Sequence, residues 1–245
     1  MRPLRRLIGT IARKTLGSYT HSVTDEPVIA LTFDDGPHPD FTPRLLDILE
    51  RYHAKATFFM VGETAQKFPE LVRLVAEKGH VIGGHSWDHP SFPLISGRER
   101  RRQMRACERA LAPYGQRLFR PPYGEQVVAS RLDALWLGYE VVCWSVDVGD
   151  WYESDASLMA GRLVEWIHPG AIVLFHETLH DQGKDTPGRG PKHYVDGWCD
   201  REAVLAAIEM MFERVSHRFK FITVPELLQH GAPYRKFWFK RTPAA

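Results

Sequence analysis

The sequence contains little cysteine, with three residues among 245, at positions 107, 143 and 199. An odd number of cysteines without a C-x-x-C spacing predicts neither a disulfide framework nor a thiolate zinc site, so we expect reduced thiols. Long apolar runs and low-complexity tracts are also missing, and we therefore expect neither a membrane-spanning helix nor a disordered or fibrous chain. With 44% apolar residues the chain can bury a hydrophobic core, and its length fits one domain.

A strong excess of either charge is missing as well, because the formal net charge is +2. Basic residues concentrate at the ends, since residues 1–20 and 232–245 contain arginine and lysine but no acid, which leaves the middle of the chain acidic. An acidic body argues against a nucleic-acid partner. The first residues show no continuous apolar stretch followed by a small-residue cleavage site, so we expect no signal peptide and a cytoplasmic protein.

Both ends mix basic with apolar side chains, a pattern typical of segments that contact an anionic membrane surface. We divide the chain into a basic amphipathic segment (1–24), a central domain (25–231) and a basic-aromatic tail (232–245). The pattern predicts peripheral contact of the two ends with the inner face of the membrane. Two solvated tails, or tails that pack on the bottom of the domain, are the alternative.

Short runs of β-branched and aromatic residues alternate with segments of helical period, which predicts parallel strands joined by crossover helices. The expected strands are 28–34, 56–61, 80–84, 118–121, 139–146, 171–175 and 219–224. The expected helices lie near 42–53, 64–78, 97–112, 126–137, 155–168 and 201–217, with Thr42 as the N-cap of the first and Pro43 in its first turn. These units predict a closed or nearly closed α/β barrel, in which reactive side chains collect at the carboxyl ends of the strands.

Three residues at two of these strand ends suit a metal ion. Asp35 follows the first expected strand, and His85 and His89 follow the third. One carboxylate and two neutral imidazoles bind divalent ions and leave coordination positions open. We predict one divalent metal ion here, with zinc first and cobalt, nickel or manganese as alternatives. Two structural histidines are the simpler interpretation of the spacing alone.

The adjacent carboxylates Asp34 and Asp35 suit different tasks, because neighbouring side chains on an extended chain point in different directions. With Asp35 on the metal, Asp34 can face the substrate and accept a proton from water, which is a general-base role. A turn aspartate is the alternative for one of the pair. Arg120, after the fourth expected strand, can hold Asp34 through a forked contact, although a surface arginine would fit the sequence too.

Two further strand ends offer groups for hydrolysis. His176 follows an apolar strand and is the expected general acid, and a carboxylate on its other ring nitrogen would raise its pKa and keep it charged. Asp147 is the predicted partner, with Asp150 as the alternative. The pair Pro121–Pro122 stiffens the chain, so the amide of Tyr123 is a candidate donor to a developing oxyanion, with a plain rigid turn as the alternative.

Five segments in this order resemble the motifs of the polysaccharide deacetylases of the NodB-homology type, carbohydrate esterase family 4. They are Thr32–Gly36 (TFDDG), His85–His89 (HSWDH), Arg120–Tyr123 (RPPY), Asp147–Trp151 (DVGDW) and Leu174–His176 (LFH). The match covers roughly residues 25–231. The resemblance implies a distorted barrel of seven or eight β/α units, a metal that is usually zinc, and hydrolysis of N-acetyl groups from an amino sugar.

Carried over residue by residue, the resemblance implies a complete site. Asp34 is the base and His176 the acid, tuned by Arg120 and Asp147 respectively, and the Tyr123 amide faces the oxyanion. The metal ligands are Asp35, His85 and His89, and the expected substrate contacts are Pro121, Pro122, Trp151 and Leu174. The expected partner is an N-acetylated glycan: an oligosaccharide, a polysaccharide or a lipid-linked precursor.

Some alternatives stay open in the sequence. Residues 178–199 form a long loop beside the expected site, which indicates either a specificity element or a surface insertion. The same chemistry would serve an O-acetyl esterase or a deformylase, and a non-catalytic carbohydrate-binding relative is a further possibility. The lack of an export signal disfavours mature extracellular polymers. The sequence does not indicate an oligomeric state.

Overall fold

The computed structural model describes residues 9, 12–180, 194–195 and 198–238. Its centre is a curled parallel sheet with the strand order β6-β5-β4-β3-β2-β8-β7, and β11 pairs with the start of β2. The strands are β2 Val28–Asp34, β3 Ala56–Met60, β4 Val81–Gly84, β5 Gly115–Phe119, β6 Glu140–Val141, β7 Val146–Asp147, β8 Ile172–His176 and β11 Lys220–Phe221. Within the described residues no ladder joins β6 to β7, so the sheet forms a half-barrel. This confirms the predicted distorted α/β barrel.

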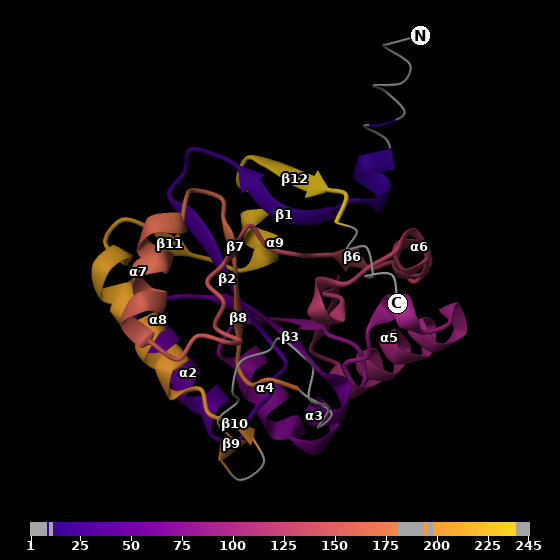
Figure 1. Ribbon diagram of the computed structural model, residues 1–245, viewed down its shortest axis with the longest axis horizontal. Helices are drawn as coiled ribbons and strands as arrows, with labels where there is room; N and C mark the ends of the chain where they lie inside the picture. The colour runs from indigo at the N-terminus through magenta and orange to yellow at the C-terminus, as the bar shows by residue number, and fades with distance from the viewer. Residues whose placement is uncertain (1–8, 10–11, 181–193, 196–197, 239–245) are drawn as a thin grey trace.

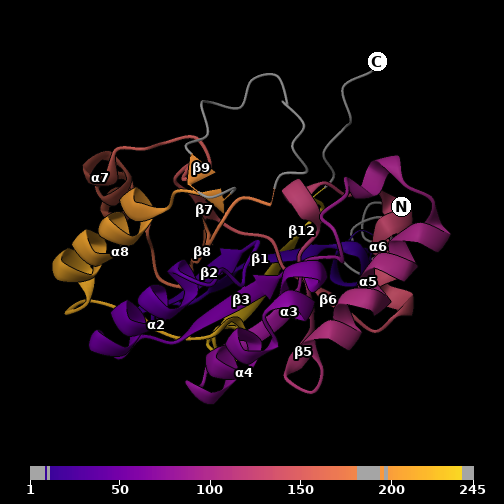
Figure 2. The same ribbon diagram turned by 90° about the horizontal axis from the view of Figure 1, so that it is seen from below.

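Helices cover the outside of this sheet (Figure 1). They are α2 Phe41–Arg51, α3 Gly62–Lys67, α4 Pro69–Glu77, α5 Gly97–Leu111, α6 Val128–Trp136, α7 Ala156–Trp166, α8 Glu202–Val215 and the short α9 Val224–Leu227. Single 3-10 turns lie at Phe92–Leu94 and Pro122–Gly124. Figure 2 shows α7 and α8 side by side at one end of the sheet. Among the described residues, no helix is both long and apolar enough to cross a membrane.

The core explains why β2 is the central strand. All seven of its residues are buried, and Phe33 packs against Phe58 of β3 and Phe175 of β8, with ring centroids 5.2 and 5.6 Å apart. Strands buried on both faces are typical of parallel sheets. Cys107 and Cys143 are free and buried, and burial raises the pKa of their thiols to about 12 and about 11, as expected for unreactive cysteines.

The strand predicted for 139–146 is divided in the structure. Its first part is β6, which pairs with β5, and its last part is β7, which pairs with β8. The buried guanidinium of Arg120 explains the break, because it donates to the carbonyl oxygens of Val142 and Cys143 at 3.2 and 3.0 Å. Those oxygens are therefore satisfied by a side chain within the gap of the half-barrel.

Two helix predictions were wrong in detail. The helix predicted for 64–78 is broken into α3 and α4 at Phe68, because Pro69 disfavours helical geometry in the residue before it. Thr42 does not cap α2, which begins at Phe41 after Asp40. Its hydroxyl instead accepts from the amide of His38 at 2.8 Å and donates to the carboxyl of Glu177.

The two ends of the described chain form a strand pair that sequence analysis did not predict. β1 (Ser18–Val23) pairs antiparallel with β12 (Ala232–Lys236), and single bridges join Tyr19 to Val142 and His21 to Ala171. β1 therefore contacts the residue after β6 and the residue before β8, and so spans the opening of the half-barrel. In Figure 1 the pair lies along one side of the molecule. A second antiparallel pair, β9 (Tyr194–Val195) and β10 (Trp198–Cys199), lies in the predicted 178–199 loop, whose residues 181–193 and 196–197 lie outside the described chain.

Candidate active site

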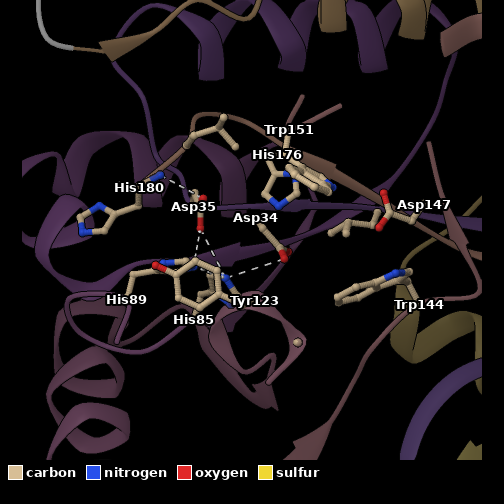
Figure 3. Close-up of a pocket in the computed structure, with 13 residues that line it drawn as sticks. Asp34, Asp35, His85, His89, Tyr123, Trp144, Asp147, Trp151, His176 and His180 are labelled. Carbon is tan, nitrogen blue, oxygen red and sulfur yellow. Dashed lines mark hydrogen bonds and ion pairs between the residues drawn. The ribbon is translucent and has the colours of Figure 1, made fainter. Parts of the chain in front are cut away.

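A pocket of about 190 Å³ opens at the carboxyl ends of the central strands. Residues that follow β2, β4, β5 and β8 meet there, as expected for a parallel barrel. The pocket is lined by Asp34, Asp35, His85, His89, Tyr123, Gly124, Trp144, Asp147, Trp151, Leu174, His176, Leu179 and His180. Figure 3 shows Asp34, Asp35 and His176 between His89 on one side and Trp144 on the other.

Asp35, His85 and His89 form a compact buried triad. Asp35 Oδ1 lies 3.4 Å from His85 Nε2 and 3.2 Å from His89 Nε2, and the two nitrogens are 3.2 Å apart. Burial favours a neutral Asp35, but His89 and His85 outweigh it and hold the pKa of the carboxyl well below its usual range. Burial lowers the pKa of His89 to about 3, so its ring is neutral, as a metal ligand must be.

The geometry of the triad fits a divalent metal ion. Ligand atoms about 2.0–2.1 Å from a tetrahedral zinc ion lie about 3.3 Å from one another, which matches the three separations. Asp35 Oδ1 is buried without a hydrogen-bond donor, which a bound cation would supply. His85 Nδ1 lies 2.7 Å from the carbonyl oxygen of Arg120, which fixes the proton there and leaves Nε2 as the ligand. The metal ligands predicted from the sequence are therefore brought together.

Asp34, the last residue of β2, is buried next to the triad and contacts Arg120 as predicted. Arg120 Nη1 donates to Asp34 Oδ1 at 2.7 Å and to the hydroxyl of Thr32 at 2.8 Å. The Arg120 side chain is fully buried, and its guanidinium stacks over the ring of Phe59 at 4.2 Å. With Oδ1 held by Arg120, the second oxygen of Asp34 lies 3.8 Å from His85 Nε2.

His176, the last residue of β8, contacts Asp150 and not the predicted Asp147. Its Nδ1 lies 2.9 Å from Asp150 Oδ1, and its amide donates to Asp150 Oδ2 at 2.8 Å. Burial opposes the charged ring, but Asp150 outweighs it and raises the pKa of His176 to about 9. Asp147 instead accepts from the amide of Gly149 at 2.9 Å, while its side chain also lines the pocket. The turn at Gly149, with φ of 76°, brings Asp150 toward the histidine.

Sequence analysis missed Arg201, which holds Asp150 from behind. Its Nη2 forms an ion pair with Asp150 Oδ2, Nη1 donates to the Asp150 carbonyl at 2.8 Å, and Nε donates to the His176 carbonyl at 3.2 Å. Arg201 lies directly before α8 and is only 4% exposed. An arginine far along the chain and outside the matched segments gives no signal in one sequence.

Glu177 is a second group that sequence analysis missed. Its carboxyl is buried beside Gly36 and accepts from the Thr42 hydroxyl, and its amide donates to the Asp34 carbonyl at 2.9 Å. Burial raises the pKa of Glu177 to about 8. A Cβ atom on Gly36 would lie 1.8 Å from Glu177 Oε2, so a larger residue at this position would displace the Glu177 carboxyl. Glu177 therefore links β8 to the loop that carries Asp35.

Several other residues reach the pocket. Tyr123 adopts left-handed backbone geometry with φ of 58°, and its ring meets His89 edge-on with centroids 4.5 Å apart. The amide of His180 donates to Asp35 Oδ2 at 3.0 Å. Of the four predicted substrate contacts, Trp151 and Leu174 line the pocket, whereas Pro121 and Pro122 are buried in the turn before Tyr123 and do not.

Comparisons with known proteins agree with this geometry. The family model "Polysaccharide deacetylase" matches residues 21–142. The chain is 40% identical over 205 residues to a peptidoglycan-N-acetylglucosamine deacetylase of Bacillus cereus, covering 82% of this chain and 68% of the relative. It is 34% identical over 169 residues to a chitooligosaccharide deacetylase of Sinorhizobium fredii, covering 66% and 77%. A solved peptidoglycan N-acetylglucosamine deacetylase superposes with a TM-score of 0.77 at 30% identity, covering 92% of this chain and 98% of that one.

Proposed function

Because this chain belongs to the polysaccharide deacetylase family, we propose that it removes the N-acetyl group from N-acetylglucosamine units of a glycan, such as peptidoglycan or a chitooligosaccharide. One observation carries the proposal: the buried triad, the carboxylate of Asp34 and the imidazole of His176 converge on one pocket. These are the groups that hydrolysis of an unactivated amide needs, namely an electrophile, a base and an acid.

Asp35 Oδ1, His85 Nε2 and His89 Nε2 would hold the metal ion, with zinc as the first choice. A divalent ion in this position supplies Lewis acidity, which polarises the acetamide carbonyl and acidifies water. Asp34 accepts the proton of the attacking water, and Arg120 keeps the carboxylate oriented toward it. A bond forms between the water oxygen and the carbonyl carbon as the C=O π bond opens, and the former carbonyl oxygen becomes negative.

His176 completes the reaction. Its pKa of about 9 keeps the ring protonated at neutral pH, so it can donate a proton to the departing sugar nitrogen as the C–N bond breaks. The products are acetate and a free amino sugar. The Tyr123 amide as an oxyanion donor remains a prediction, as do the cytoplasmic location and the membrane contact of the ends.

The experiment measures acetate release by metal-reconstituted protein from N-acetylglucosamine oligomers, peptidoglycan fragments and a lipid-linked sugar. O-acetylated and N-formylated sugars are included to test the ester and formamide alternatives. We expect release from the N-acetylated oligomers, with loss of release in Asp34→Asn and after chelation. Release from only the O-acetylated or N-formylated sugars would overturn the proposal, and so would no release from any member of the panel.

A further inference from the structure

A second, larger hollow adjoins the active-site pocket. It has a volume of about 780 Å³ and shares Trp144 and Asp147 with the pocket. Figure 3 shows these two residues on the side of the pocket away from His89 and His180. The hollow, here called the terminal groove, is lined by residues of β1, β7, β12, the end of α7 and the segments beside them: Thr20, His21, Val23, Trp144, Ser145, Val146, Asp147, Trp166, Tyr234, Lys236 and Trp238.

The terminal groove is rich in aromatic rings. Trp144 and Trp238 pack with centroids 5.0 Å apart at 60°, and Tyr234 stacks on His21 at 4.7 Å and 25°. Trp166 is 44% exposed and Tyr234 is 37% exposed. Clustered exposed aromatic side chains on a soluble domain indicate a binding surface. Flat rings of this kind match the apolar C–H faces of pyranose sugars.

Polar side chains in the groove favour a sugar chain over a lipid surface. Ser145 is exposed and Asp147 is half-buried, and their hydroxyl and carboxylate groups can hydrogen-bond sugar hydroxyls, whereas Thr20 is buried and contacts His21. Lys236 is the single lysine or arginine in this lining, which also contains the acidic Asp147. An anionic membrane would instead favour several basic side chains together. Aromatic walls with a few polar groups are typical of specific ligand sites.

The volumes of the two cavities also favour a bound sugar chain. Sites that enclose a whole small-molecule ligand measure roughly 300–1,000 Å³, so a pocket of about 190 Å³ suits a single sugar residue. A glycan whose acetylated unit occupies this pocket must continue outside it. The terminal groove begins at the pocket wall and is large enough for the next residues of the chain.

We propose that the terminal groove binds the sugar residues that neighbour the N-acetylglucosamine unit in the active-site pocket. This inference rests on the proposed function, because the groove is a subsite of that substrate. It assigns the described part of both chain ends to substrate binding, since β1 and β12 supply much of the wall. The enzyme would therefore prefer long oligomers to short ones.

The main variant is Trp166→Ala, with Trp166→Phe to restore a ring. Trp166 is partly exposed at the last position of α7, so its removal should leave the thermal unfolding midpoint nearly unchanged. The matched control is Trp136→Ala, which removes a tryptophan that is 68% exposed at the last position of α6. Trp136 is absent from the lining of both cavities.

The first measurement compares kcat/KM on the N-acetylglucosamine hexamer with that on the dimer. In wild type we expect the hexamer to be favoured, and in Trp166→Ala we expect that preference to fall about three- to ten-fold, through KM. Trp166→Phe should retain most of the preference, and Trp136→Ala all of it. An unchanged preference in Trp166→Ala would overturn the proposal.

The second measurement separates this proposal from the proposed function. Calorimetry compares hexamer binding to Asp34→Asn with binding to the double variant Asp34→Asn/Trp166→Ala. About three- to ten-fold weaker binding to the double variant supports the terminal groove even if the wild type releases no acetate. Equal affinities overturn the groove while leaving deacetylation intact, and no hexamer binding to Asp34→Asn overturns the groove as well.

Discussion

On one side of the pocket Arg120 contacts Asp34 directly, whereas on the other side Arg201 contacts Asp150, which in turn contacts His176. Both arginines are buried. Both also donate to backbone carbonyls, and these hydrogen bonds fix the neighbouring loop. The difference is the carboxylate of Asp150, which lies between the arginine and the histidine. Arg201, Asp150 and His176 are here called the relay. The guanidinium next to Asp34 holds that carboxylate in place, while Asp150 next to His176 raises the pKa of the ring and keeps it positive.

The largest expected loss of activity comes from the Asp34 side of the pocket, where the arginine contacts the proposed base directly. Asp34→Asn keeps the shape of the side chain but removes the base, so we expect kcat to fall about 10²- to 10⁴-fold. Single-turnover measurement of acetate release checks this value. The Asp34→Asn variant should still bind oligomers. A fall of less than about tenfold would assign the base to another residue.

The second prediction breaks the relay at its carboxylate. Asp150→Asn removes the negative charge that raises the pKa of His176 to about 9, so the pKa falls to or below its ordinary value of 6.5. Wild-type kcat/KM should decline as pH rises through about 9, and in the variant the decline should begin near or below 6.5. At pH 8 this corresponds to about a 30-fold loss or more.

Asp147→Asn is the matched control for that experiment, because Asp147 lines the same pocket but does not contact His176 Nδ1. The pH at which its kcat/KM declines should stay where it is in wild type. A shift in Asp147→Asn with none in Asp150→Asn would restore the pairing that the sequence suggested.

The third prediction concerns the arginine behind the relay. Arg201→Ala leaves the Asp150 carboxylate buried with one partner fewer, and we expect the free energy of unfolding to fall by about 3–5 kcal/mol. Arg201→Lys keeps the charge but loses the contacts that the guanidinium makes with Asp150 and His176. Its free energy of unfolding should therefore lie between those of Arg201→Ala and wild type. Urea unfolding measures both, and equal stability of all three proteins would show that Arg201 does not support the relay.

The smallest effect is expected at Glu177, whose neutral carboxyl joins β8 to the Asp35 loop. Its pKa rises from an ordinary 4.5 to about 8 in the folded protein, so the folded state binds more protons than the unfolded state between these values. Stability from this group is therefore present below about 4.5 and is lost as pH rises through about 8.

Glu177→Gln keeps an acceptor for the Thr42 hydroxyl and removes this titration. We expect the variant to differ from wild type by about 1 kcal/mol or less at pH 5 and to lose less stability than wild type at pH 8. Chelator-treated protein is used at both pH values. Parallel loss of stability in the two proteins would contradict the assignment.

Much of the site was predictable because its residues directly follow strands. The distorted α/β barrel, the deacetylase family and the enzyme class are confirmed, and the structure joins Asp35, His85 and His89 as the sequence suggested. Asp147 and Asp150 lie three residues apart, and the backbone geometry at Gly149 together with the contacts of Arg201 brings Asp150 to His176. The role of each residue in the reaction and the identity of the metal stay predictions.

The terminal strands β1 and β12 could not be predicted from the sequence, for a different reason. In β1 the buried positions are Ser18, Thr20 and Ser22, so the face toward the body is polar and hydrophobic periodicity does not detect it. Ser18 is held by Gln126, and the Ser22 hydroxyl by the His230 carbonyl. Buried Arg131 adds donors to the carbonyls of Leu16 and Gly17. Such long-range hydrogen bonds have no signature in the local sequence.

The β1–β12 pair also decides how the domain responds to mechanical load. Ser18 lies opposite Lys236, and the pairing runs from there to Val23 and Ala232. Tension applied to the two flanking segments would pull on the same end of this ladder, so its hydrogen bonds would break one after another and not all together. Because β1 and β12 supply much of the wall of the terminal groove, opening of this ladder would act on the groove and not on the strand ends that carry the catalytic pocket.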